Sequence, residues 1–110
     1  LAPSTFDRAI NQATQTLEDR IRKKAEAGRK AVGDALISAA FNGDLAKTIL
    51  KLSNHSEEQE GLTHIFRGIM LAFRHKTHHH LVDFTREEAM KVCGFVDVLL
   101  KVVDGSQKIR

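Results

Sequence analysis

The residues best suited to chemistry lie in one short segment, Arg74-His75-Lys76-Thr77-His78-His79-His80, which holds four of the six histidines of the chain. Arginine carries a permanent, fork-shaped cation that binds phosphate oxygens, and histidine takes up and releases a proton near neutral pH. These are the two functions that cleavage of an RNA phosphodiester requires when no metal takes part. The segment is therefore the first candidate for a functional site.

Two amphipathic helices are predicted on either side of this segment. The first begins at a capping-box pattern, Ser56 followed by Gln59, and the second at Thr85 followed by Glu88. The apolar residues of the first recur at helical spacing up to Phe73, and those of the second up to Asp104-Gly105. They are Leu62, Ile65, Phe66, Ile69, Met70 and Phe73 in the first helix, and Ala89, Val92, Cys93, Val96, Leu99, Leu100 and Val103 in the second.

About ten residues thus connect two helix ends, and they are rich in donors and poor in apolar anchors. If the helix continues for one more turn, Arg74 and His78 lie within reach of a common anion. Lys76 and either His79 or His80 then reach the same anion. If the helix ends earlier, the connection still allows the imidazoles to fold back toward the guanidinium. Either arrangement brings the cation and a proton-transfer group together.

The remaining chain predicts two further helices and one undecided stretch. Apolar residues from Phe6 to Ile21 indicate a helix capped by Ser4 or Thr5 and ending near Gly28. A shorter helix is expected over about residues 30–41, and it is stopped by Asn42-Gly43. Residues 43–55 fit either a helical turn or a short extended segment. The sequence predicts one all-α domain over residues 1–110, an up-and-down bundle of four or five helices.

Composition limits the classes of protein to be considered. The chain has 110 residues, a net charge of +3 and one cysteine, Cys93, so no intramolecular disulfide forms and a cytoplasmic location is expected. No apolar run approaches the ~20 residues that span a bilayer, which predicts no membrane association. Because the chain begins at Leu1, we expect it to be either a trimmed chain or the carboxyl-terminal piece of a longer protein. The basic stretch over residues 20–30 suits either contact with a nucleic acid or a solvated helix end.

Structural roles compete with functional ones for several residues. Arg74 also suits an ion pair with Asp83 or Glu87 at the start of the next helix. The run of three histidines suits zinc or nickel, but no cysteine or carboxylate pattern accompanies it, so we predict neither a metal nor a cofactor. His64 is interpreted as a surface residue, His55 as a structural residue before the Ser56 cap, and Cys93 as a buried structural thiol.

Three stretches of the chain resemble a known family. They are Glu57-Glu58-Gln59-Glu60-Gly61-Leu62, then Phe66-Arg67-Gly68-Ile69-Met70-Leu71-Ala72-Phe73-Arg74, and then His79. The order from Arg74 to His79 is an arginine, a polar residue, three further residues and a histidine. This order resembles the motif of the HEPN superfamily (higher eukaryotes and prokaryotes nucleotide-binding). More narrowly, residues 30–103 resemble its bacterial Ymh-type family of uncharacterised proteins. The chain has His75 where the family usually has asparagine and His80 where an acid is common, and the spacing favours His79 over His80 as the working histidine.

The resemblance implies an all-α, HEPN-like bundle that forms a homodimer and acts as a metal-independent endoribonuclease in a toxin or phage-defence role. Arg74 and His79 would be catalytic, with the guanidinium binding the scissile phosphate and the imidazole acting as acid and base for attack by the 2′-hydroxyl. His75, Lys76 and His80 would bind the nucleic acid. The implied partners are RNA, a second copy of the chain and an antitoxin protein. The alternative is a non-catalytic module of the same fold that binds nucleic acid or nucleotides, or that only dimerises.

Overall fold

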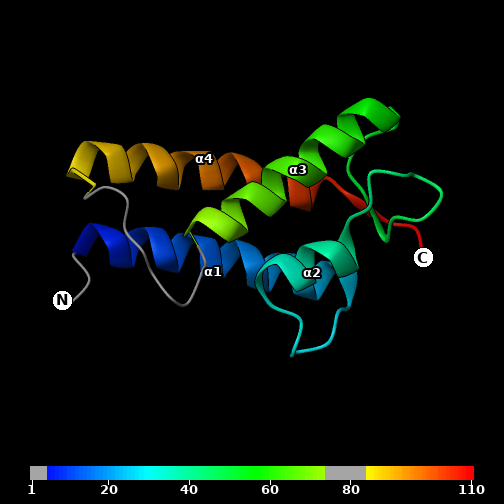
Figure 1. The fold of residues 1–110 in the computed structure, drawn as a ribbon, viewed down its shortest axis with the longest axis horizontal. Helices are drawn as coiled ribbons and strands as arrows, with labels where there is room; N and C mark the ends of the chain where they lie inside the picture. The colour runs from blue at the N-terminus through cyan, green and yellow to red at the C-terminus, as the bar shows by residue number, and fades with distance from the viewer. Residues whose placement is uncertain (1–4, 74–83) are drawn as a thin grey trace.

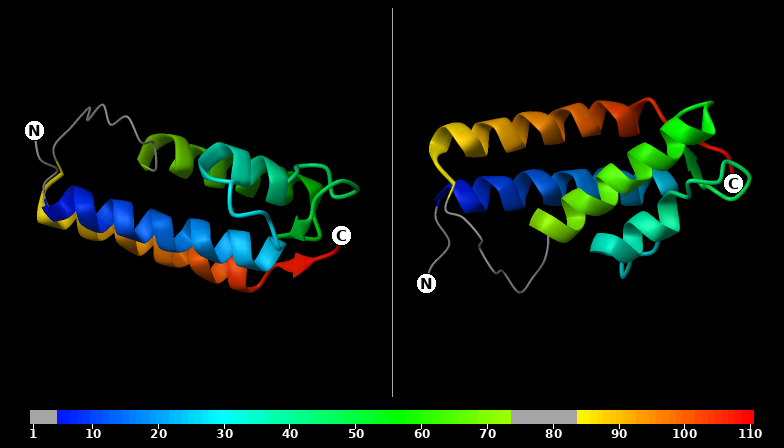
Figure 2. Two further views of the ribbon diagram at one scale, coloured as in Figure 1. Left: turned by 90° about the horizontal axis from the view of Figure 1, so that it is seen from below. Right: turned by 45° about the horizontal axis from the view of Figure 1, so that its top comes forward.

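The computed structural model describes residues 5–73 and 84–110, and it confirms the small all-α bundle within these ranges (Figure 1). Its helices are α1 (Thr5–Ala25), α2 (Gly33–Ala40), α3 (Ser56–Phe73) and α4 (Arg86–Asp104). The longest two, α1 and α4, lie side by side and run in the same direction in all views, whereas α3 runs back obliquely across α1 (Figure 2). The short helix α2 packs against α3 and α1.

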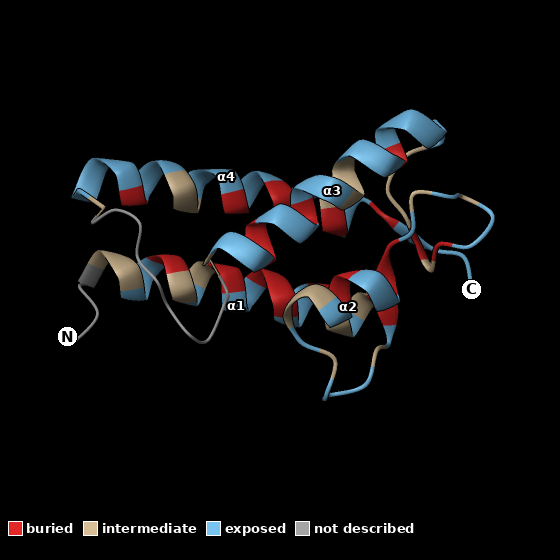
Figure 3. Ribbon diagram, viewed as in Figure 1, coloured by how far each residue is buried: buried red, intermediate tan, exposed pale blue. Residues whose placement is uncertain are grey.

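One apolar core joins the four helices, and most of its helical residues recur at the predicted spacing (Figure 3). Ile65, a member of the predicted apolar set, is instead exposed. The ring of Phe66 on α3 is fully buried and stacks on Phe41, with ring centroids 4.8 Å apart. Burial of each large side chain of this kind stabilises the fold by roughly 1.5–3 kcal/mol. The other large core residues are Leu17, Ile21, Leu36, Ile37, Leu50, Ile69, Met70, Val96, Leu99 and Val103.

The two predicted capping boxes have different outcomes. At the start of α4 the Thr85 hydroxyl accepts a hydrogen bond from the Glu88 N–H, and the Glu88 side chain accepts one from the Thr85 N–H, as predicted. The box at Ser56 is wrong, because Ser56 is already helical and the Gln59 side chain is fully buried and bonds elsewhere. A buried amide must satisfy its donors and acceptors locally, and the backbone of residues 42–53 offers it partners that a helix end does not.

Residues 44–51 contain both structures that the sequence left open. The N–H groups of Lys47 and Thr48 donate to the Asp44 carbonyl, which forms a single helical turn. Strand β1 (Leu50–Lys51) follows and pairs antiparallel with β2 (Gln107–Lys108). The bundle therefore has four helices in the described residues, and the sequence did not indicate the strand pair.

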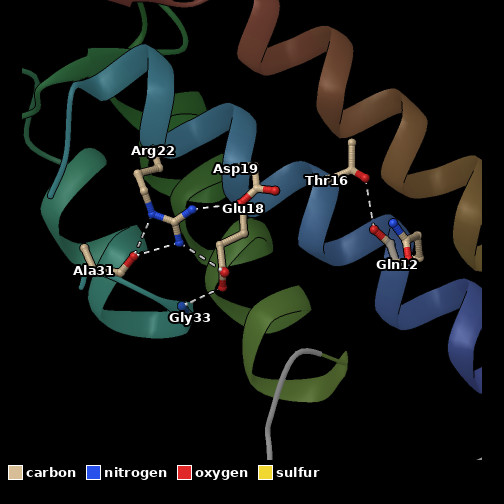
Figure 4. A network of polar contacts seen from close by, with 7 residues as sticks. All are labelled: Gln12, Thr16, Glu18, Asp19, Arg22, Ala31 and Gly33. Carbon is tan, nitrogen blue, oxygen red and sulfur yellow. Dashed lines mark hydrogen bonds and ion pairs between the residues drawn. The ribbon is translucent and has the colours of Figure 1, made fainter. Parts of the chain in front are cut away.

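The end of α1 is joined to the start of α2 by a network around Glu18 and Arg22 (Figure 4). The Glu18 carboxylate is almost fully buried, and it accepts from the Gly33 N–H at 2.9 Å and from Arg22 Nη2 at 3.2 Å. Arg22 also donates to the Ala31 carbonyl through Nε and Nη2. Gly33 has φ +55°, which glycine adopts without strain.

No helix in the described part of the chain is long and apolar enough to cross a bilayer.

Candidate functional site

All five residues predicted to act on RNA (Arg74, His75, Lys76, His79 and His80) lie outside the described residues, as does Asp83. The structure does describe both flanks of their segment. Helix α3 ends at Phe73, the residue just before Arg74, and Phe84 follows the segment directly. The rings of Phe73 and Phe84 contact one another, with centroids 6.0 Å apart and planes at 49°. The residue before the segment is therefore packed against the residue after it.

The amino-terminal end of α4 forms the second part of this flank. The hydrogen bonds that Glu88 receives from the backbone and side chain of Thr85 lower the pKa of its carboxyl, so the capping carboxylate is ionised at neutral pH. Glu87, one of the two acids predicted as a structural partner for Arg74, lies 3.9 Å from Lys91 on the same helix. Both side chains of this pair are largely exposed, so it contributes little to stability.

The basic stretch over residues 20–30 is partly used within the chain. Arg20 makes a two-oxygen contact with Asp104, and Lys24 donates to the carbonyl of the same residue. Arg22 belongs to the Glu18 network and is only 17% exposed. Three of the six cations of this stretch therefore hold α1 to α4 or to the start of α2. This arrangement favours the interpretation of the basic stretch as a helix end. It does not favour a continuous surface that contacts nucleic acid.

A second polar site, which the sequence did not predict, lies between α2, the loop after it and α3. It is a pocket of about 510 Å³. Its lining residues are Ser38, Phe41, Asn42, Gly43, Asp44, Glu60, Thr63, His64 and Arg67. His64 is exposed, as predicted, but it also lines this pocket. The recurrence of Glu60, His64 and Arg67 at steps of four and three residues was the signal in the sequence, since it places them on one flank of α3.

The charged side chains of the pocket contact other residues at its α2 end and at its loop end. At the α2 end, Arg67 Nε lies 2.8 Å from an Asp34 carboxylate oxygen, and Nη2 donates to the Ser38 hydroxyl at 3.1 Å. At the loop end, a Cβ atom added at Gly43 would lie 3.2 Å from Glu60 Cγ, so glycine permits the loop to approach α3. His64 Nε2 stands 3.7 Å from a Glu60 oxygen, too far for a hydrogen bond.

Metal and thiol chemistry receive little support from the described residues. Within residues 5–73 and 84–110 no three histidine, cysteine, aspartate or glutamate side chains are grouped so as to hold a metal ion. His78, His79 and His80 are outside these ranges. Cys93, predicted to be buried, is only partly buried, because it lies on the edge of the inward face of α4. Burial, followed by the nearby Asp97 charge, raises the pKa of its thiol.

The four packed helices define a small, all-α protein of the helical-bundle class. The model of the Hypoth_Ymh family, described as "Protein of unknown function", matches residues 1–103. The chain therefore belongs to the Hypoth_Ymh family. No curated protein and no solved structure matches it.

Proposed function

We propose that this protein is a metal-independent endoribonuclease of the HEPN type. The observation that carries the proposal is the position of the Arg74-to-His79 motif between α3 and α4, in a segment whose flanking residues Phe73 and Phe84 pack together. When the two ends of a connection are held close together, less entropy is lost on forming a site within it. The motif itself resembles that of HEPN ribonucleases, and a toxin or phage-defence role with an antitoxin partner rests on this resemblance alone.

In the proposed mechanism Arg74 binds the non-bridging oxygens of the scissile phosphate and stabilises the charge that develops on them. His79 removes the proton of the ribose 2′-hydroxyl, and the 2′-oxygen forms a bond to phosphorus. The bond from phosphorus to the 5′-oxygen breaks, and a second imidazole, His79 of a second copy, protonates the leaving oxygen. The products are a 2′,3′-cyclic phosphate and a 5′-hydroxyl. His75, Lys76 and His80 contact the neighbouring phosphates.

The test is incubation of the pure protein with RNA in EDTA, with analysis of the product ends. We expect 2′,3′-cyclic phosphate ends from the wild type and a loss of about 10²- to 10⁴-fold in rate for His79→Ala. Arg74→Ala should also lose activity, whereas His55→Ala, an exposed histidine outside the segment, is the matched control. Cleavage that survives both His79→Ala and Arg74→Ala would refute the proposal. Salt-sensitive binding of RNA without cleavage would instead establish the non-catalytic binding module.

The second copy required by this mechanism has a candidate surface on α3. Gly61, Ile65, Gly68 and Ala72 form an exposed stripe at helical spacing, and Ile65 is 42% exposed. A Cβ atom at Gly61 or Gly68 would meet no atom within 4 Å, so packing within the described chain does not require glycine there. Each glycine in a helix interior costs about 1 kcal/mol relative to alanine. Close approach of a second helix would account for this cost, and we include a homodimer through this stripe in the proposal.

A further inference from the structure

We infer that the pocket between α2 and α3 binds a guanine base of the RNA substrate. The inference rests on the proposed ribonuclease function, because it names the base that this substrate presents beside the scissile phosphate. Sequence-specific recognition of RNA commonly takes an unstacked base of a single strand into a pocket and reads its polar edges. The pocket volume of about 510 Å³ accommodates a purine.

The loop wall of the pocket is built before any ligand arrives. The fully buried Gln59 side chain accepts from the Leu52 N–H at 2.7 Å and donates to the carbonyls of Asn42 and Leu50. The Thr48 hydroxyl, also buried, accepts from the Asn42 N–H and donates to the Leu50 carbonyl. These bonds attach both ends of the 42–50 loop to α3. A wall held in this way loses little conformational entropy on binding.

The polar groups of the pocket match the two edges of guanine. Asp44 and Glu60 provide carboxylates at the loop end, although Asp44 Oδ1 already accepts from the Ala46 N–H at 2.9 Å. A carboxylate accepts in parallel from the adjacent N1–H and N2–H groups of guanine. Arg67 lies at the α2 end, and within residues 5–73 and 84–110 its side chain bonds through Nε and Nη2 alone, which leaves Nη1 to donate to O6 or N7. Buried Phe41 is an apolar part of the lining. Adenine has an unprotonated N1 and no 2-amino group, and uracil has one ring N–H without an adjacent amino group, so they fit this set less completely.

The distance from the pocket to the end of α3 allows one RNA strand to contact both. Arg67 precedes the end of α3 at Phe73 by six residues, which corresponds to about 9 Å along the helix axis at 1.5 Å per residue. Successive nucleotides in a strand are about 3.4 Å apart when stacked and farther apart when splayed out. A base within a few nucleotides of a phosphate bound beside the end of α3 therefore reaches the pocket.

The test measures binding of nucleoside monophosphates to the full chain by nuclear magnetic resonance titration. We expect GMP to bind about tenfold more tightly than AMP or UMP, and IMP, which lacks only the N2 amino group, to lose most of this preference. Asp44→Asn and Glu60→Gln should each reduce the preference for GMP over IMP. Glu57→Gln, an exposed glutamate in the first turn of the same helix and outside the pocket, should leave it unchanged.

Failure of this inference is distinct from failure of the proposed function. Equal affinity for GMP, AMP, UMP and IMP, no saturable GMP binding up to about 10 mM, or a preference that persists in both Asp44→Asn and Glu60→Gln would each overturn the pocket assignment. Cleavage of RNA that depends on His79 would still stand in those cases. Conversely, GMP preference without any cleavage would sustain the pocket and remove the ribonuclease.

Discussion

At the scale of single residues, the most consequential side chain is Gln59, because one amide satisfies groups from three parts of the chain. Its oxygen accepts from the N–H groups of Leu52 and Ser53, and its nitrogen donates to Asn42, Thr48 and Leu50. A glutamine among helix residues at this spacing is ordinarily a solvated or capping residue. Only its complete burial distinguishes it.

We predict that Gln59→Ala destabilises the protein by about 2–4 kcal/mol, since it leaves buried backbone donors and acceptors without partners. Chemical denaturation followed by circular dichroism measures this change. Gln15→Ala, an exposed glutamine on α1, should change the free energy of unfolding by less than about 0.5 kcal/mol. If Gln59→Ala and Gln15→Ala both change the free energy of unfolding by the same small amount, water replaces the Gln59 amide without loss of stability.

The lowered pKa of Glu88 predicts how the free energy of unfolding depends on pH. Because its pKa is lowered in the folded protein, its ionised form stabilises the fold at neutral pH, and this contribution is lost as pH falls through the folded pKa. The free energy of unfolding should therefore fall less steeply for Glu88→Gln than for the wild type between about pH 5 and pH 3. Glu87→Gln, on the same turn but outside the capping box, should follow the wild-type profile. Superimposable profiles for Glu88→Gln and wild type would contradict the capping role.

At the scale of elements, α3 carries different surfaces on its different sides. One side enters the core through Phe66 and Met70, and the polar flank with Glu60 and Arg67 lines the pocket. On the exposed stripe, a Cβ atom added at Gly61 or Gly68 would meet no atom of the described chain within 4 Å. These surfaces follow from the period of 3.6 residues, which distributes side chains around the helix.

The glycine stripe predicts two effects of opposite sign. The double change Gly61→Ala and Gly68→Ala should raise the free energy of unfolding of the monomer by up to about 1 kcal/mol per site, because alanine restricts the unfolded chain and favours the helix. The same change should weaken the homodimer, measured by sedimentation equilibrium, because added methyl groups separate the two helices.

Gly94→Ala is the matched control, since Gly94 lies inside α4 and its Cβ would also meet open space. It should stabilise the monomer without changing the dimer. A wild-type monomer at tens of micromolar, or an unchanged dimer in the double variant, would remove the stripe from the interface.

At the scale of the whole molecule, the carboxyl-terminal residues bond to the backbone of residues 45–49 in the loop after α2. The Ile109 N–H donates to the Ile49 carbonyl, and the Arg110 guanidinium donates to the carbonyls of Leu45, Ala46 and Thr48. The last residues after α4 thus hold the loop that Gln59 holds from inside. This segment lies beyond residue 103, where the family match ends.

We predict that Arg110→Ala increases hydrogen exchange of the backbone N–H groups in residues 44–49 and destabilises the protein by about 1–2 kcal/mol, because three carbonyls lose a charged donor. Exchange followed by mass spectrometry measures the first effect. Arg29→Ala, an exposed arginine in the turn before α2, should alter neither quantity. Unchanged exchange in residues 44–49 would show that the strand pair alone holds the loop.

The sequence by itself determined the helices, much of the core and the cap at Thr85. These features depend on contacts between residues a few positions apart, so apolar spacing and the Thr85-to-Glu88 pattern suffice to predict them. Family membership also follows from the sequence, while the motif at Arg74 and His79 remains a prediction outside the described residues.

Only the tertiary structure decided the role of Gln59, the strand pair and the pocket. Leu50 pairs with Lys108 across 58 positions of the chain, and Gln59 bonds to Asn42 across 17. Neither pairing leaves a local pattern, because two-residue strands are too short for periodicity and a buried amide has the same sequence as an exposed one. The pocket exists because the fold brings the 42–50 loop against α3, and that approach is a property of the whole molecule.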